Sequence, residues 1–242
     1  MLQRVITQGR RTIPTDREAL GQCLGIAEEE PHRRRIGRRF FNRSPEIVAP
    51  QMLGKVLRHK FNGKWLSGRV TEVEAYLGLN DPASHAYNGR TERNRVLFGP
   101  PGMAYVYLIY GMYWCLNVSC LPEGQPGGVL FRAIEPLEGA KTMARLRSLP
   151  TGSSASRISG GPGRLCQALG ITRKINGVDM TRSDSLLRFA DDGHTAPEFE
   201  VTARIGIQKA AHLPLRFVVS PYRAASGIDT ESQMNINQRG GP

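Results

Sequence analysis

The chain has 242 residues, of which 40 % are hydrophobic, so it is long and apolar enough to bury one substantial core. With 33 Lys and Arg against 21 Asp and Glu, its formal net charge is +12, which favours nucleic acid as a partner and an anionic membrane surface second. No run approaches the roughly 20 apolar residues of a spanning helix, and the N-terminus has no signal-peptide pattern, so we expect neither membrane insertion nor secretion.

Cysteine and histidine usage points to a reducing compartment and to chemistry without a metal. The four cysteines form no CxxC pair, and Cys115 and Cys120 lie in an apolar run, so we expect reduced core thiols and a cytoplasmic protein, nucleoid-associated in a bacterium. The histidines and cysteines show no ligand-spaced cluster and no cofactor loop is visible, so we expect no metal and no cofactor.

Three segments are expected along the chain: a basic extension over residues 1–37, one domain over 38–230 and a flexible tail over 231–242. The extension combines "EEE" with "HRRRIGRR" and has little apolar periodicity. Its basic run is either a solvated leader or a non-specific phosphate anchor, and the interleaved acids slightly favour the leader.

The first elements of the domain are a short helix and a hairpin. Ser44 before Pro45 and Glu46 predicts a helix start, and Gly54 can end that helix. The dipeptide Asn62-Gly63, between "KVLRHKF" and "KWLSGRVTEVEAYL", predicts a tight two-residue turn between antiparallel strands.

The second strand of that hairpin brings an acid and an aromatic together. Its period of two places Glu72, Glu74 and Tyr76 on one face, with Val73 and Ala75 on the other. By itself, however, the pattern favours an ordinary solvated strand acid at Glu74 over a functional group.

A polar loop follows, and then an aromatic strand. Residues 80–102 are rich in turn formers, with one helical turn expected at "RNRVLF". The next stretch, "GMAYVYLIYGMYWCLN", begins as a strand with Tyr105 and Tyr107 on one face, while "YGMYW" breaks the alternation and places Tyr110 at a bend.

The remaining pattern alternates strands and helices. We expect a buried strand at "GGVLFRAIEP", a basic helix at "GAKTMARLRSL", a glycine-rich turn into a helix near Gly163, and late strands at "ARIGI" and "LPLRFVV". No internal repeat is visible.

The cluster of tyrosines has two possible interpretations, one structural and one functional. Four of the seven tyrosines lie between residues 105 and 114. Aromatic residues favour strands and fill cores, which accounts for Tyr105 and Tyr113. A basic protein that displays aromatics beside an acid also has the parts needed to stack an unpaired base.

Five ordered blocks make the sequence resemble a known family. "VTEVEAYLG", "DPASHA", "RTERNRVLFGPPGMAYVYLIYGMYWCLNV", "VLFRAIEPLEG" and "GPGRLCQALGI", spread over residues 38–217, together are similar to the alkyladenine (3-methyladenine) DNA glycosylases, also called methylpurine DNA glycosylases. The resemblance implies a single α/β (α+β) domain with a curved, largely antiparallel sheet and surrounding helices, like a formyltransferase C-terminal domain. It also implies a monofunctional, monomeric enzyme that flips 3-methyladenine or hypoxanthine from double-stranded DNA and hydrolyses its N-glycosidic bond, leaving an abasic site.

The resemblance also implies roles at the reacting bond. Glu74 is the expected general base that activates water, since a nearby carboxylate can accept its proton as the sugar develops positive charge. Arg132 is expected to position the water or the sugar phosphate; its alternative is a buried partner of Glu135 or another acid.

Base flipping implies a pocket and a wedge. The family pattern assigns the stacking walls to Tyr76, His85 and Tyr107 and the base-edge contact to the backbone at Ala83. The remaining two roles are the pocket floor, where Asn117 excludes guanine, and the intercalating wedge, Tyr110.

Phosphate contacts are the least specific expectation. Gly163 and Arg164 at a helix start offer N–H groups, a favourable dipole and a cation together, and Arg93 and Arg95 are further candidates. A solvated basic face is the alternative for each arginine. Two other functions use the same composition: a non-catalytic nucleic-acid-binding module, which has no need of Glu74, and an RNA-modifying enzyme, which would prefer 2′-hydroxyls.

Overall fold

The computed structural model describes residues 34–195 and 197–220. The strands are β1 (Arg34–Arg35), β2 (Val56–Phe61), β3 (Lys64–Tyr76), β4 (Ala104–Ile109), β5 (Tyr113–Ser119), β6 (Gly128–Glu138), β7 (Leu187–Asp191), β8 (Phe199–Thr202) and β9 (Arg216–Val219). The α-helices are α2 (Arg38–Phe41), α3 (Pro45–Met52), α4 (Ala140–Leu146), α5 (Ala155–Ser159) and α6 (Pro162–Leu169). Short 3₁₀ helices are η1 (Gly78–Asn80), η2 (Arg95–Phe98) and η3 (Arg173–Ile175).

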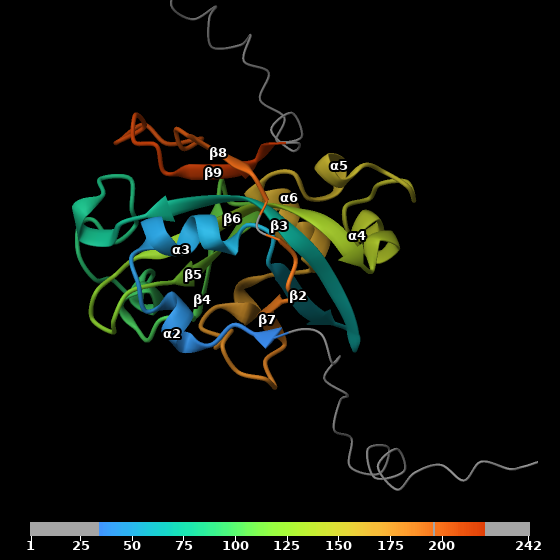
Figure 1. Cartoon of the computed structure of the whole chain (residues 1–242), viewed down its shortest axis with the longest axis horizontal. Helices are drawn as coiled ribbons and strands as arrows, with labels where there is room; N and C mark the ends of the chain where they lie inside the picture. The colour runs from blue at the N-terminus through green and yellow to red at the C-terminus, as the bar shows by residue number, and fades with distance from the viewer. Residues whose placement is uncertain (1–33, 196, 221–242) are drawn as a thin grey trace, which may run out of the picture. The chain divides into compact units, whose positions relative to one another are not determined.

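All of the described strands belong to one curled antiparallel sheet, which confirms the mixed α/β class (Figure 1). Its order is β1-β7-β2-β3-β6-β5-β4, and β9 joins it through β3 and carries β8. The long strand β3 organises this sheet because its first half pairs with β2, its residues 72–74 pair with β9, and β6 runs along its other side.

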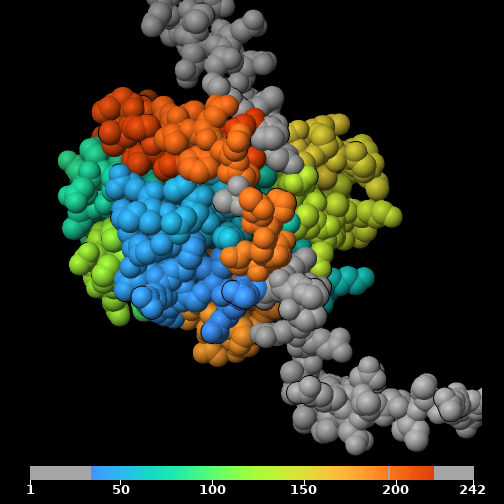
Figure 2. All heavy atoms as spheres, viewed as in Figure 1, coloured from blue at the N-terminus to red at the C-terminus, as the bar shows by residue number. Residues whose placement is uncertain are grey.

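The predicted β2–β3 hairpin is confirmed, with Asn62 at φ 47° and Gly63 at φ 78° as a mirror-image turn requires. The helix after Ser44 is also confirmed; Gly54 follows it at φ 81°, and Pro197 packs against that glycine. In the space-filling view, α2 and α3 (blue) and the segment with β8 and β9 (orange to red) adjoin on one face (Figure 2).

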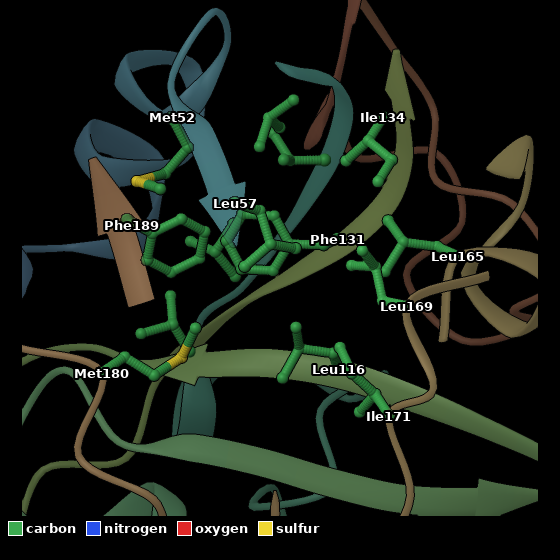
Figure 3. Packing of buried hydrophobic residues seen from close by; sticks show 14 of the residues in the cluster. Met52, Leu57, Leu116, Phe131, Ile134, Leu165, Leu169, Ile171, Met180 and Phe189 are labelled. Atoms are coloured by element: carbon green, nitrogen blue, oxygen red, sulfur yellow. The ribbon is translucent and has the colours of Figure 1, made fainter. Parts of the chain in front are cut away.

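One contiguous core joins the inner side of the sheet to the helices. Helix α3 packs on β3 and β6. Helix α6 packs on β5 and β6, α5 packs on β6 and α6, and α4 packs on α6 and β3. Figure 3 shows Phe131 of β6 at the centre, with Met52, Leu57 and Phe189 on one side and Leu165 and Leu169 of α6 on the other. These side chains are almost completely buried, so burial of apolar surface fixes the curl of the sheet.

The core leaves the opposite sheet face for polar and aromatic groups. Along β3, β4, β5 and β6, core residues alternate with outward residues. The outward residues are Glu72, Glu74, Tyr76, Tyr105, Tyr107, Cys115, Asn117, Leu130 and Arg132. One alternating pattern therefore builds both the core and a candidate site.

The structure contradicts two expectations from the sequence, and other expectations concern residues that it does not describe. The segment "ARIGI" is not a strand: Thr202 ends β8, Arg204 turns its side chain inward, and the Ile205 N–H bonds to a side chain instead of a neighbouring strand. Tyr113 was expected to pack in the core, but it is 37 % exposed. Residues 1–33 of the expected extension, the tail over 231–242 and Cys23 lie outside the described residues.

Candidate active site

The carboxylate of Glu74 lies at the centre of the outward face. Glu74 is fully buried, which excludes a solvated strand acid. The Tyr76 hydroxyl donates to Oε2 over 2.9 Å and the Ile205 N–H donates to Oε1 over 2.9 Å, while Arg132 Nη1 lies 3.2 Å from Oε1. These contacts from three chain segments fix the orientation of the carboxylate.

Arg132 bridges this carboxylate to a second one behind it. Its Nε donates to Glu72 Oε1 over 2.7 Å, and Arg216 Nε donates to the same oxygen over 2.6 Å. Burial opposes the charge of Arg132, but Glu74 and Glu72 outweigh it and raise the pKa of the guanidinium. Two acids and two arginines thus form a charge-balanced cluster. Arg132 is buried and pairs with Glu72 and Glu74 and not with Glu135, so the alternative of a buried arginine paired with another acid holds.

An aromatic wall stands beside Glu74. The Tyr105 and Tyr107 rings stack with centroids 5.1 Å apart, and the His85 ring meets Tyr107 edge-on at 4.5 Å. Tyr105 is 1 % exposed, and its hydroxyl shares a hydrogen bond with His85 Nδ1 over 3.0 Å. Its expected packing role is confirmed, and it also holds the histidine.

Burial keeps the tyrosine hydroxyls of this wall protonated. It raises the pKa of Tyr105 to about 12, and burial together with the Glu74 charge raises the pKa values of Tyr76 and Tyr107 far above the ordinary range. The His85 ring keeps an exposed edge, but desolvation against its neighbours and the charge of Arg93 lower its pKa. The wall is therefore uncharged at neutral pH.

These residues line an inner pocket that opens onto a larger cleft. The inner pocket is about 60 Å³ and is lined by Tyr76, Ala83, Ser84, His85, Leu97, Tyr105, Tyr107, Asn117 and Gly128. The outer cleft is about 680 Å³, within the range of small-molecule sites. Tyr76, His85 and Tyr107 line both cavities, so they form the boundary between them.

The structure brings together all five expected base-pocket residues. Asn117 is 5 % exposed, and its side chain hydrogen-bonds the Tyr107 hydroxyl, which places the amide on the pocket lining. Ala83 and His85 come from the loop between β3 and β4, as does Ser84, which the sequence did not single out.

Tyr110 lies at the mouth of the outer cleft. It sits in the β4–β5 turn at φ 51°, and its side chain is 79 % exposed, which confirms the expected bend. A positive φ is unfavourable for a bulky residue, so the strain must be offset by the hairpin around it. Met112, two residues on, is 64 % exposed and extends this apolar tip.

The expected phosphate-binding residues separate into two groups. Gly163 and Arg164, near the start of α6, line the outer cleft, and a Cβ at Gly163 would lie 3.0 Å from the Tyr113 Cβ. Arg93 lies 5.9 Å from the Tyr107 ring, close to the same cleft. Arg95 is not among the cleft residues; its side chain is 63 % exposed and pairs loosely with Glu92 at 3.7 Å.

Several residues that build the site were given no role in the sequence analysis. Arg147 lines the cleft from just beyond α4 and was visible only as part of a basic helix. Glu72, two residues before Glu74, shares its face and holds Arg132 in place. Arg216 and the buried pair of Asp81 and Arg204 depend on contacts between distant segments, which a strand pattern does not reveal.

The cysteine prediction is confirmed for the described residues: Cys115, Cys120 and Cys166 are free and buried. Burial raises the pKa of Cys115 to about 11, so this cleft residue remains a thiol. Residues 34–195 and 197–220 contain no cluster of three or more His, Cys, Asp or Glu able to hold a metal ion. Within the same ranges no helix is long and apolar enough to cross a membrane.

Comparison with known proteins identifies the family. Residues 39–223 match the family model described as methylpurine-DNA glycosylase. Proteins named "Putative 3-methyladenine DNA glycosylase" from Koribacter versatilis, Burkholderia cenocepacia and Desulfitobacterium hafniense are 54 %, 44 % and 40 % identical to the chain. The alignments cover 79 %, 79 % and 76 % of this chain and 93 %, 91 % and 94 % of those proteins. The chain therefore belongs to the methylpurine-DNA glycosylase family and is a DNA N-glycosylase, a hydrolase that removes alkylated purines in base excision repair.

Proposed function

We propose that this glycosylase flips alkylated or deaminated purines, of the 3-methyladenine and hypoxanthine type, out of double-stranded DNA and cleaves them with a water activated by Glu74. The observation that carries this proposal is the buried, fixed carboxylate of Glu74 beside an uncharged aromatic wall. The extruded base stacks at the boundary formed by Tyr76, His85 and Tyr107, with the backbone at Ala83 at its edge and Asn117 crowding the position of a guanine amine.

In the proposed reaction, the carboxylate of Glu74 accepts a proton as the water oxygen bonds to the sugar C1′. The N-glycosidic bond breaks, and its electron pair leaves with the base. Arg132 orients the water or the sugar phosphate from its position 3.2 Å from Glu74. A methylated cationic purine leaves as a neutral base, whereas hypoxanthine needs a proton as well.

The outer cleft supplies the proposed DNA contacts. Tyr110 fills the space that the flipped base vacates, because an exposed aromatic side chain at a hairpin tip can stack within an opened duplex. Gly163, Arg164 and Arg93 bind the flanking phosphates, and Arg147 extends this basic rim. Arg95 is a peripheral phosphate contact in this account. The proposed domain over residues 38–230 contains all of these residues. The enzyme is proposed to act as a monomer in the cytoplasm.

Base release tests the proposal directly. Duplex oligonucleotides carrying one hypoxanthine, or alkylated with a methylating agent, should show alkali-labile strand breaks after incubation with the enzyme. A matched undamaged duplex serves as the control and should remain intact. An RNA duplex of the same sequence should release no base; there the free base is measured directly, because alkali cleaves RNA by itself. Tight, salt-sensitive binding of damaged DNA without release from either substrate would favour the non-catalytic binding module, and preferential action on RNA would favour an RNA-modifying enzyme.

A further inference from the structure

A second buried ion pair lies next to the Glu74 cluster. Arg204 Nη1 donates to Asp81 Oδ2 over 2.5 Å and Nη2 donates to Oδ1 over 2.8 Å, and both side chains are fully buried. This pair joins the loop after β3 to the segment between β8 and β9. Asp81 and Arg204 are 123 positions apart in the sequence. Paired donors and acceptors of this geometry are directional as well as strong.

Arg204 also reaches the pocket wall. Its guanidinium carbon lies 4.6 Å from the centroid of the Tyr76 ring, and Nη1 donates to the Ala75 carbonyl over 3.0 Å. A guanidinium stacked on an aromatic face restricts the tilt of the ring. Arg204 therefore supports the tyrosine that both lines the pocket and hydrogen-bonds Glu74.

Asp81 organises the loop that carries the base-edge contacts. Its carboxylate accepts the Ala83 N–H over 3.0 Å and the Leu77 N–H over 3.1 Å. Burial of Asp81 disfavours its charge, but the hydrogen bonds from Arg204 and from these two backbone N–H groups outweigh that effect and lower its pKa. The backbone position of Ala83 thus depends on the charge that Arg204 neutralises.

The residue after Arg204 touches the reacting carboxylate itself. The Ile205 N–H donates to Glu74 Oε1 over 2.9 Å. Two adjacent residues therefore hold the two halves of the site: the Arg204 side chain holds the base-reading loop and the Tyr76 ring, and the Ile205 backbone holds Glu74.

A contribution to stability does not by itself explain the buried pair of Arg204 and Asp81. Arg204 Nε is buried without a hydrogen-bond partner among the residues that the structure describes. An apolar side chain of similar volume can replace a buried ion pair at little or no cost, whereas an unsatisfied buried donor is a penalty. What an apolar replacement cannot provide is the fixed geometry between Asp81, Tyr76 and the backbone at Ile205.

We propose, resting on the proposed function, that Arg204 is a positioning residue that couples the base pocket to the water-activating carboxylate through Asp81, Tyr76 and Ile205. A base seated correctly against Ala83 and Tyr76 then finds Glu74 aligned, because all these contacts belong to one rigid unit. The coupling would favour cleavage of bases that fill the pocket over bases that only enter the outer cleft.

The coupling can be tested on the wild-type protein without reference to catalysis. Amide hydrogen exchange followed by NMR should give Ile205 and Ala83 the same free energy of opening, because the Asp81–Arg204 pair joins their segments. In Arg204→Lys, which keeps the charge but loses the bidentate fork and the stacking, both amides should lose protection together. Unequal opening in the wild type, or loss of protection at one amide only, overturns the inference.

The functional consequence is measured by single-turnover base release from damaged duplex DNA. Arg204→Lys and Asp81→Asn should slow release by on the order of a hundredfold, while binding to undamaged duplex is unchanged. The matched control is Arg182→Gln, which breaks the exposed bidentate Arg182–Asp184 pair and should leave release unaffected. If the wild type releases base and the folded variants release it at the same rate, the coupling inference is overturned but the proposed function stands. If the wild type releases no base, the proposed function is overturned, and the hydrogen-exchange result decides whether the coupling exists.

Discussion

The Tyr76 hydroxyl donates a hydrogen bond to Glu74 over 2.9 Å along the same strand. Tyr76→Phe removes this donor and keeps the stacking ring. A hydrogen bond to a charged group contributes about 1.5 kcal/mol or more, so single-turnover base release should slow by roughly tenfold while affinity for damaged DNA changes little. Tyr87→Phe, at an exposed loop tyrosine, is the control. An equal loss of affinity and rate would show that the hydroxyl acts in binding and not on Glu74.

The wedge role of Tyr110 predicts an effect on damaged DNA without an effect on stability. Tyr110→Asn removes the aromatic ring, and asparagine tolerates the positive φ of this turn. Stacking of one base on an aromatic ring is worth about 1–3 kcal/mol, so affinity for hypoxanthine-containing duplex should fall accordingly, with an unchanged unfolding temperature. Leu186→Asn, at another exposed apolar residue, should leave affinity unchanged. Unaltered affinity in Tyr110→Asn would argue against intercalation.

The basic rim of the cleft predicts a change in salt dependence. Each phosphate contact releases counterions on binding, so Arg164→Gln should lower the slope of log affinity against log salt by about 1 for any duplex sequence. Filter binding or fluorescence anisotropy across a salt series measures the slope. Arg182→Gln, at an exposed arginine already paired with Asp184, is the control. A wild-type slope in Arg164→Gln would remove α6 from the DNA contacts.

The buried histidine on β2 predicts a loss of stability in mild acid. His59 is 4 % exposed and hydrogen-bonds the Leu169 carbonyl through Nδ1 over 2.7 Å. Burial lowers its pKa despite that bond. Below its ordinary pKa of 6.5 the unfolded chain takes up a proton that the folded chain resists, so the free energy of unfolding should fall as the pH drops below 6.5, by at most about 1.4 kcal/mol per pH unit from this group. Urea denaturation of wild type and His59→Gln at pH 7 and pH 5.5 should show a larger fall in the wild type.

Local patterns predicted much of the fold and the candidate site. The Asn62-Gly63 turn and the period of two along β3 and β4 placed Glu74, Tyr76 and Tyr107 on one sheet face. Those signals depend on neighbouring residues only. The resemblance to a family then supplied roles that the pattern left open, since a strand acid by itself does not reveal whether it is solvated.

What the sequence did not reveal depends on contacts between distant segments. "ARIGI" has the alternation of a strand, but the ion pair of Arg204 with Asp81 draws it out of the sheet. Tyr113 is an aromatic strand residue of the kind that fills cores, but it lies beside Gly163 and lines the outer cleft. The pairing of Glu72 with both Arg132 and Arg216 requires three strands to meet, which no single window of sequence contains.

The most direct test of the central claim compares wild type with Glu74→Gln on one hypoxanthine-containing duplex, measuring binding and single-turnover base release on the same preparations. Glutamine keeps the size of the side chain but cannot accept the proton of the attacking water. Glu46→Gln, at an exposed acid in α3, controls for loss of a negative charge. The account predicts that Glu74→Gln binds the damaged duplex and releases no base, while wild type and the control release it. Base release by Glu74→Gln at the wild-type rate would contradict it.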